Sequence, residues 1–195
     1  MKHRAFLAFD ISDKMKAELA KVISVLSPKV TGVKWVEPKL MHCTIRFFGD
    51  VEEELLLGKL SSLIEREVLH QTPIHLKGQG VGAFPNWRYP KVFWAGLVGD
   101  AEALLSLQAK LEESFKTLGF AEDKRVFRLH LTLGRARSAL KNCDALMQIV
   151  EKCADREFGE VVVDSLTLYK SVLTRDGSIY TPLKSFPMGH HKKRS

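Results

Sequence analysis

The sequence has little of what marks a secreted, membrane or metal-binding protein. Its 195 residues hold only three cysteines, Cys43, Cys143 and Cys153, and none forms a C-x-x-C pair. An odd and scattered set of cysteines argues against a disulfide framework and a structural zinc site. No apolar run reaches about 18 residues, and Met1-Lys-His-Arg leads straight into a strand-like segment. We therefore expect no membrane helix and no signal peptide, and a cytoplasmic location.

The composition is that of an ordinary soluble domain with a mild basic excess. Hydrophobic residues make up 45% and charged residues 27%, so the chain can bury a substantial core. Lys and Arg outnumber Asp and Glu by 30 to 23, which gives a formal charge of +7, and three of these positive charges lie at Lys192, Lys193 and Arg194. Such an excess favours an anionic partner, such as a nucleic acid or a nucleotide. We expect a monomer.

The most informative feature of the organisation is an internal duplication. The order strand, helix, strand, helix, strand occurs twice, and a hairpin with strands at 169–173 and 178–183 closes the chain, turning at 176–177. The chain is therefore predicted to be one two-lobed domain over residues 1–195, with pseudo-repeats over about 4–88 and 90–183. We expect the elements of the first unit at 4–9, 15–26, 41–48, 52–70 and 74–78, and those of the second at 91–98, 101–118, 125–133, 139–154 and 160–168.

Each half carries the same short motif at the same place. The first copy is His42-Cys-Thr44-Ile and the second is His130-Leu-Thr132-Leu. A motif of this length is common by chance. Chance is a much poorer explanation for two copies in corresponding strands of a duplicated pattern. The pair indicates that the two motif strands meet at a shared cleft.

Alternation along a strand gives each motif strand one polar and one apolar side. The apolar sides suit packing against helices, and the polar sides expose the motif side chains. The predicted polar faces hold His42, Thr44 and Arg46 in the first strand and Arg128, His130 and Thr132 in the second, and the apolar faces hold Cys43, Ile45 and Phe47 and Leu129, Leu131 and Leu133.

This arrangement suits the hydrolysis of a cyclic phosphate. The reaction needs a base for water and an acid for the departing ribose oxygen, roughly in line across phosphorus. Because imidazole titrates near neutrality, His42 and His130 can fill both roles, while the hydroxyls of Thr44 and Thr132 donate to the phosphate oxygens. No carboxylate cluster stands beside the histidines, so we expect no metal. The alternative, a zinc pair at the two histidines, lacks a third ligand at a suitable spacing.

Several segments together resemble a known family, the bacterial and archaeal RNA 2′,3′-cyclic phosphodiesterases, also called 2′-5′ RNA ligases, within the 2H phosphoesterases. The paired motifs are the specific part, and the likeness extends over nearly the whole chain. Two departures are Cys43 at a commonly aliphatic position and Leu129 in place of a common proline. The resemblance is carried by 6–10, 34–35, 42–49, 82–85, 91–94, 118–120, 130–135, 168–169 and 171–183.

The resemblance implies an α+β fold with two lobes of antiparallel sheet, outer helices and a central cleft. It implies hydrolysis of RNA or nucleotide 2′,3′-cyclic phosphate ends to 2′-phosphates without a cofactor, and ATP-independent 2′-5′ ligation as the reverse reaction. It further implies that His130 activates water, that His42 protonates the leaving 3′ oxygen, and that Arg135 holds phosphate. Strict alternation would place Arg135 on the apolar face, so we expect a bulge at Gly134 to re-aim it.

Two other functions stay open at this point. An RNA-binding module could keep the fold without the reaction, although both motif histidines are present. A related phosphoesterase could act on another cyclic phosphate, such as an ADP-ribose derivative. Three aromatic residues, Trp35, Phe48 and Phe84, are candidates for stacking on a nucleobase, with packing in the core or at its rim as the alternative.

Overall fold

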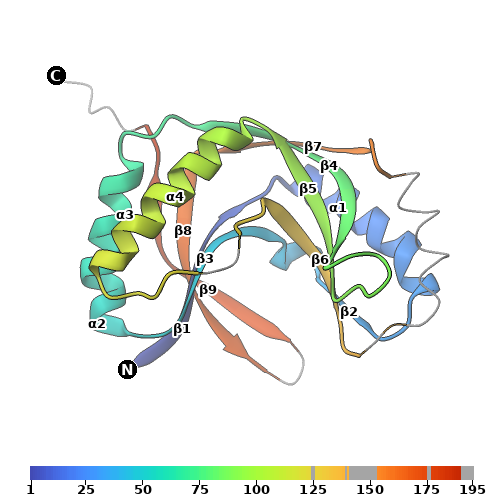
Figure 1. Cartoon of the computed structure of the whole chain (residues 1–195), viewed down its shortest axis with the longest axis horizontal. Helices are drawn as coiled ribbons and strands as arrows, with labels where there is room; N and C mark the ends of the chain where they lie inside the picture. The colour runs from blue at the N-terminus through green and yellow to red at the C-terminus, as the bar shows by residue number, and fades with distance from the viewer. Residues whose placement is uncertain (124–125, 139, 141–152, 175–176, 190–195) are drawn as a thin grey trace.

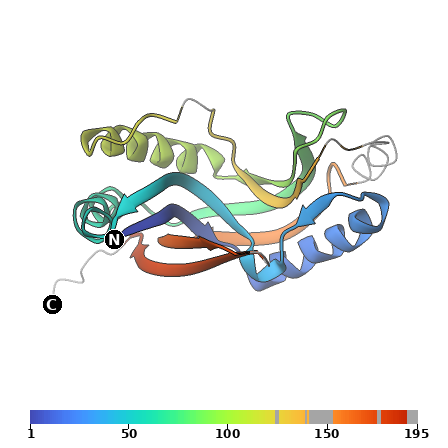
Figure 2. The same cartoon turned by 90° about the horizontal axis from the view of Figure 1, so that it is seen from below.

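The computed structural model describes residues 1–123, 126–138, 140, 153–174 and 177–189. Two antiparallel sheets with helices on their outer sides form the molecule (Figures 1 and 2). This arrangement confirms the predicted α+β fold. The first sheet has the order β3-β1-β8-β9, with β1 at Lys2–Asp10, β3 at His42–Glu52, β8 at Ser165–Leu173 and β9 at Ser178–Pro187. The second has the order β2-β6-β5-β4-β7, with β2 at Val33–Trp35, β4 at Ile74–Phe84, β5 at Val92–Gly99, β6 at His130–Ala136 and β7 at Glu157–Val163.

The sheets do not follow the two halves of the sequence. Strand β4 comes from the first half and lies in the second sheet between β5 and β7, while β8 and β9 come from the second half and extend the first sheet from β1. Each sheet therefore takes strands from both halves, which ties them together. The pseudo-repeats at about 4–88 and 90–183 therefore stay a prediction from the order of elements in the sequence.

The strand predicted at 160–168 is wrong in its extent. The chain leaves the second sheet at the end of β7 and enters the first sheet at the start of β8, and Asp164 stands between them. The main-chain oxygen of Asp164 accepts a hydrogen bond of 2.7 Å from the N–H of Met188. Buried side chains continue at every second or third residue through this crossing, so the sequence alone reads it as one strand.

The helices form where the apolar periodicity predicts them. Helix α1 (Asp13–Leu26) begins after Ser12, whose hydroxyl accepts a hydrogen bond of 3.3 Å from the N–H of Met15. Helix α4 (Ala101–Thr117) packs on the helical segment after β3 and on β4. That segment, predicted at 52–70, is continuous but contains a π-turn, and it comprises α2 (Glu53–Leu55), η3 (Leu56–Leu60) and α3 (Ser61–Val68). Two short 3₁₀ turns are η1 (Ser27–Lys29) and η2 (Pro38–Leu40).

Two of the predicted features lie partly outside the described residues. These are the helix at 139–154 and the turn at 176–177, although β8 and β9 pair as the predicted hairpin. The second motif strand begins at His130, later than the predicted 125. None of the described helices is long and apolar enough to cross a membrane.

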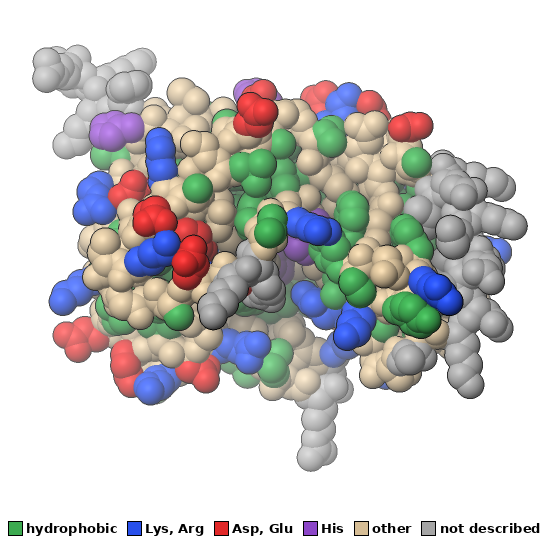
Figure 3. Space-filling model, viewed as in Figure 1, with side chains coloured by type: hydrophobic (Ala, Val, Ile, Leu, Met, Phe, Trp, Pro, Cys, Tyr) green, Lys and Arg blue, Asp and Glu red, His purple; other side chains and the backbone are tan. Residues whose placement is uncertain are grey.

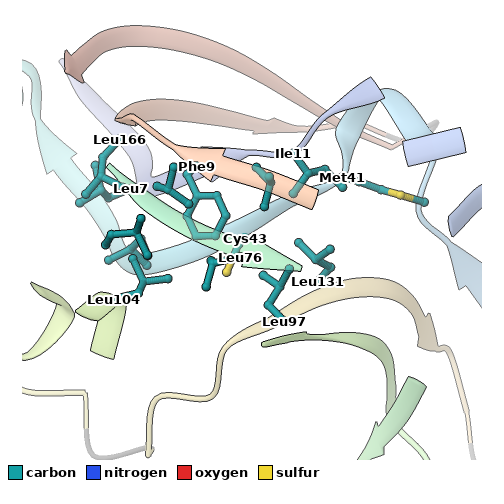
Figure 4. Packing of buried hydrophobic residues seen from close by; sticks show 14 of the residues in the cluster. Leu7, Phe9, Ile11, Met41, Cys43, Leu76, Leu97, Leu104, Leu131 and Leu166 are labelled. Carbon is teal, nitrogen blue, oxygen red and sulfur yellow. The ribbon is translucent and has the colours of Figure 1, made fainter. Parts of the chain in front are cut away.

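The core lies between the two sheets and under the helices (Figure 4). Side chains from β1, β3, β4, β5, β6, β8 and α4 meet there, as the labelled Leu7, Cys43, Leu97, Leu104 and Leu131 show. Phe9 of β1 pairs in register with Cys43 of β3, and both are buried. This packing holds β3 and β6 against each other, and these are the two strands that begin with the motif histidines.

Candidate active site

A cleft of about 750 Å³ opens where β3 and β6 meet. Its lining includes Thr44, His130, Thr132 and Arg135, with residues of α4 and residues 122–123 and 126–128 also contributing. Figure 3 looks onto this face, where histidine side chains are visible in a central hollow. Acidic side chains gather on the α4 side of the hollow and basic ones on the other (Figure 3). The cleft thus has a polarity that would orient an anion.

His42 is held on several sides. Its Nδ1 lies 2.8 Å from the main-chain oxygen of Leu40, and its Nε2 lies 3.1 Å from the hydroxyl of Thr44. The ring stacks on Phe6, with 5.0 Å between ring centroids, and meets the edge of Tyr180 at 5.2 Å. The imidazole therefore has little freedom to rotate.

His130 is held by a similar main-chain contact. Its Nδ1 lies 2.6 Å from the main-chain oxygen of Arg128, and its ring meets Phe84 edge to face at 5.1 Å. In both motifs the Nδ1 partner is the carbonyl two residues before the histidine. Because a carbonyl only accepts hydrogen bonds, we assign a proton to Nδ1 in both rings, which leaves Nε2 to give or take a proton.

The protein environment disfavours the charged form of both imidazoles. Burial lowers the pKa of His42 and of His130, and the positive charge of Arg135 acts in the same direction on each. For His42, the hydrogen bond to the Leu40 carbonyl and the charge of Asp10 oppose this shift. The charge of Arg135 therefore reaches both motif histidines, and Arg135 lines the cleft together with His130.

A β-bulge brings Arg135 to this position. His130 pairs with Gly96 and Thr132 with Trp94, but the register then shifts so that Arg135 pairs with Val92. The shift puts Arg135 on the same face as His130 and Thr132, which confirms the bulge predicted at Gly134. A Cβ at Gly134 would lie only 2.7 Å from the Trp35 ring and 2.8 Å from Val33, so the site requires glycine.

A second bulge makes the predicted face of Arg46 wrong. In the β1–β3 pair the register shifts between Ala8, which pairs with Thr44, and Leu7, which pairs with Arg46. This removes Arg46 from the His42 face. Its buried guanidinium forms an ion pair of 3.0 Å with Glu112 of α4 and donates to the main-chain oxygen of Ala121. Arg46 therefore ties β3 to α4 and to the segment that follows it.

The same bulge brings Phe47 onto the cleft face, where the sequence analysis did not place it. Phe47 pairs with Phe6, lines the cleft and leaves 45% of its surface exposed. It stands five residues after His42, as Arg135 stands five residues after His130. That matched spacing is the signal in the sequence that could have found it.

The three aromatic candidates separate clearly. Phe48 packs on Phe115 at 4.9 Å, and Trp35 packs on Phe93 at 5.4 Å, so both belong to the core rim. Phe84 lines the cleft beside His130, and the guanidinium of Arg128 lies over its ring at 5.3 Å.

Within the described part of the chain, no three His, Cys, Asp or Glu side chains gather as a metal-binding group. Whether the reaction proceeds without a metal stays a prediction.

Two antiparallel sheets with outer helices and a cleft between matched motif strands define a 2H phosphoesterase fold. Solved structures agree over nearly the whole chain. A protein of Thermus thermophilus has a TM-score of 0.79 and 27% identity, covering 96% of this chain and 100% of that one. Escherichia coli LigT complexed with 3′-AMP has a TM-score of 0.77 and 25% identity, covering 96% and 99%.

The chain belongs to the 2′-5′ RNA ligase superfamily, whose family model matches residues 17–175. Among its relatives, an RNA 2′,3′-cyclic phosphodiesterase of Archaeoglobus fulgidus is 40% identical over 94% of this chain and 99% of that protein. A protein of the same name from Methanothermobacter thermautotrophicus is 34% identical over 95% and 99%.

Proposed function

We propose that the protein hydrolyses the 2′,3′-cyclic phosphate at the end of an RNA or nucleotide and leaves a 2′-phosphate. The observation that carries this proposal is one cleft lined by Thr44 of the first motif and by His130 and Thr132 of the second, with Arg135 in its lining and close enough to act on the pKa of both motif histidines. The near full-length relatives that bear the name RNA 2′,3′-cyclic phosphodiesterase support the same reaction class.

The two histidines divide the proton transfers. Water attacks phosphorus and gives a proton to Nε2 of His130, while the bond from phosphorus to the 3′ oxygen breaks in line. Nε2 of His42 gives a proton to that oxygen, so each histidine ends in the protonation state of the other. The Nδ1 contacts to Leu40 and Arg128 keep both rings in the tautomer that this transfer requires.

Three further side chains stabilise the charge on phosphorus. The hydroxyls of Thr44 and Thr132 can donate to the non-bridging oxygens, where negative charge concentrates in the transition state. Arg135 adds a fixed positive charge and planar donors that suit phosphate oxygens. The acidic side chains on the α4 side of the cleft repel phosphate. The phosphate of the substrate is therefore favoured on the β6 side.

Phe47 and Phe84 give the cleft apolar surfaces for the sugar and base of the terminal nucleotide. Both rings line the cleft. Stacking on an aromatic ring tolerates all four bases, which suits an enzyme that reads an end rather than a sequence. If the 5′ hydroxyl of a second RNA replaced water, the same groups would join two ends through a 2′-5′ linkage without ATP.

The test is an assay panel with EDTA present. It comprises the four nucleoside 2′,3′-cyclic phosphates, an RNA with a cyclic end and an ADP-ribose cyclic phosphate, with products identified by phosphorus NMR. We expect 2′-phosphates, with the RNA end among the substrates. Loss of activity in EDTA with recovery in zinc would contradict the mechanism, and turnover of the ADP-ribose compound alone would contradict the substrate class.

A further inference from the structure

The two motif histidines have different cross-strand neighbours. In the first sheet His42 pairs with Asp10 of β1, and in the second sheet His130 pairs with Gly96 of β5. These pairs occupy equivalent places, because Ala8 faces Thr44 as Trp94 faces Thr132. The first histidine therefore has a carboxylate as its direct neighbour, where the second has a residue with no side chain.

The carboxylate beside His42 is fixed by a second contact. The hydroxyl of Tyr169 in β8 donates a hydrogen bond of 2.8 Å to Oδ2 of Asp10. The Tyr169 ring stacks on Phe6 at 5.2 Å, and Phe6 stacks in turn on His42. Burial, and then the bond to Asp10, raise the pKa of Tyr169, so the phenol keeps its proton at neutral pH. The donor to Asp10 is therefore always present.

Glycine at the equivalent place in the second sheet is not interchangeable with Asp. A Cβ on Gly96 would lie 2.6 Å from the main-chain oxygen of Gln79. No side chain fits there without movement of β4. The difference between the two histidines is thus built into the backbone spacing of the second sheet.

We propose that Asp10, oriented by Tyr169, is a positioning residue that makes His42 the proton donor and leaves His130 the proton acceptor. The roles of donor and acceptor rest on the proposed function, whereas the preference for the proton can be measured in the free protein. Asp10 lies at the edge of the site, and no step requires it to contact substrate.

The charged groups around the two rings support this direction. His42 is faced by Asp10 from β1, Arg135 from β6 and Tyr180 from β9, while Tyr169 of β8 contacts Phe6 and Asp10. The cation acts on both rings, and burial lowers the pKa of both, with His42 the more buried ring, so Asp10 acts against a larger burial effect at His42. The charge of Asp10 raises the pKa of His42, and among the described groups no carboxylate acts on His130 in this way.

The first experiment uses the free protein and no substrate. Ring signals of His42 and His130 are titrated by NMR in the wild type, in Asp10→Asn and in Tyr169→Phe. An exposed carboxylate about 5 Å away shifts a pKa by about half a unit. We expect Asp10→Asn to lower the pKa of His42 by about this amount and to leave that of His130 in place, with a smaller change in Tyr169→Phe.

A matched control is Asp50→Asn. Asp50 is an exposed carboxylate in β3, the strand of His42, and it pairs in register with Arg4 at the far end of that strand. This variant also removes one negative charge, and it should change the pKa of neither His42 nor His130. Asp10→Glu should recover part of the wild-type value. An unchanged pKa of His42 in Asp10→Asn, or equal shifts of both histidines, would overturn the proposal.

The second experiment follows hydrolysis of a nucleoside 2′,3′-cyclic phosphate against pH. Activity requires a protonated donor and an unprotonated acceptor. In the pH–rate profile, the alkaline limb therefore reports the pKa of the donor and the acidic limb that of the acceptor. Asp10→Asn should move the alkaline limb to lower pH by about half a unit and leave the acidic limb in place. Movement of the acidic limb alone would overturn the assignment. If the NMR titrations gave the expected pKa changes but the wild-type protein hydrolysed no cyclic phosphate, the proposed function would be refuted. The preference of His42 for the proton would still stand.

Discussion

Strands β3 and β6 build the cleft with the same local device and different side chains. Each begins with a motif histidine whose Nδ1 faces the carbonyl two residues earlier, and each has a bulge soon after the motif threonine. The residue delivered to the cleft by the bulge is Phe47 in β3 and Arg135 in β6. The residue before it is the buried Arg46 in β3 and Gly134 in β6.

This difference shows how a duplicated backbone can serve an asymmetric substrate. In the proposed mechanism, the proton transfers need two similar groups on opposite sides of phosphorus, and the two motif histidines would supply them. A terminal nucleotide, however, has a phosphate at one end and a base at the other. Arg135 suits the first and Phe47 the second, so under the proposed function the same position in the two strands would serve two different parts of the substrate.

The largest effects are expected where the two strands are alike. Because the proposed mechanism gives each histidine one proton transfer, His42→Ala and His130→Ala should each lower kcat by about 10²–10⁴-fold. Since both act on one transition state, the double variant should lose less than the product of the single losses. Steady-state kinetics on the three variants test this, with circular dichroism to confirm folding. A folded His42→Ala enzyme with nearly normal kcat would rule out the two-histidine scheme.

Smaller and divergent effects are expected for the two arginines. Arg135→Ala should lower kcat/KM by about 10–100-fold with little loss of stability, because it removes a phosphate contact worth about 1.5–3 kcal/mol. Arg46→Ala should instead lower the free energy of unfolding by about 1–3 kcal/mol, since it leaves Glu112 in a half-buried place without its cation.

Paired measurements of kinetics and urea unfolding on these two variants separate the roles. Arg135→Lys serves as a control that keeps the charge and loses the planar donors. The reverse pattern, with turnover lost in a stable Arg46→Ala protein and Arg135→Ala nearly normal, would show that the bulges do not assign these residues as described.

The bulges also mark the limit of prediction from the sequence. The order of the helices and strands follows from the repeated apolar patterns, and the motif histidines and threonines from their matched spacing, whereas the two antiparallel sheets were implied by the family resemblance. In β6 the bulge was predictable, because Gly134 and the resemblance both called for it. In β3 it falls at Ile45 and Arg46, where no glycine or proline marks it, and simple alternation then puts Arg46 and Phe47 on the wrong faces.

The prediction of a single strand at 160–168 failed for a similar reason. Phe158 and Val161 face the core of one sheet, and Leu166 and Leu168 that of the other, with Asp164 at the junction. Local periodicity reports that side chains are buried and says nothing of which sheet buries them. The partner of a strand is set by packing across the whole domain.

The smallest effect, and the sharpest test of the asymmetry, is expected at Phe47. Phe47→Leu keeps an apolar side chain and removes the flat ring, so it should raise KM for a nucleoside 2′,3′-cyclic phosphate by about fivefold, or about 1 kcal/mol, with kcat nearly unchanged. A substrate without a base, 1-O-methylribose 2,3-cyclic phosphate, should bind the variant and the wild type equally. Val162→Ala in β7, which trims an exposed apolar residue that the cleft lining does not include, is the control. If Phe47→Leu raised KM as much for the substrate without a base as for the nucleotide, Phe47 would act through the structure of β3 and not by stacking on the base.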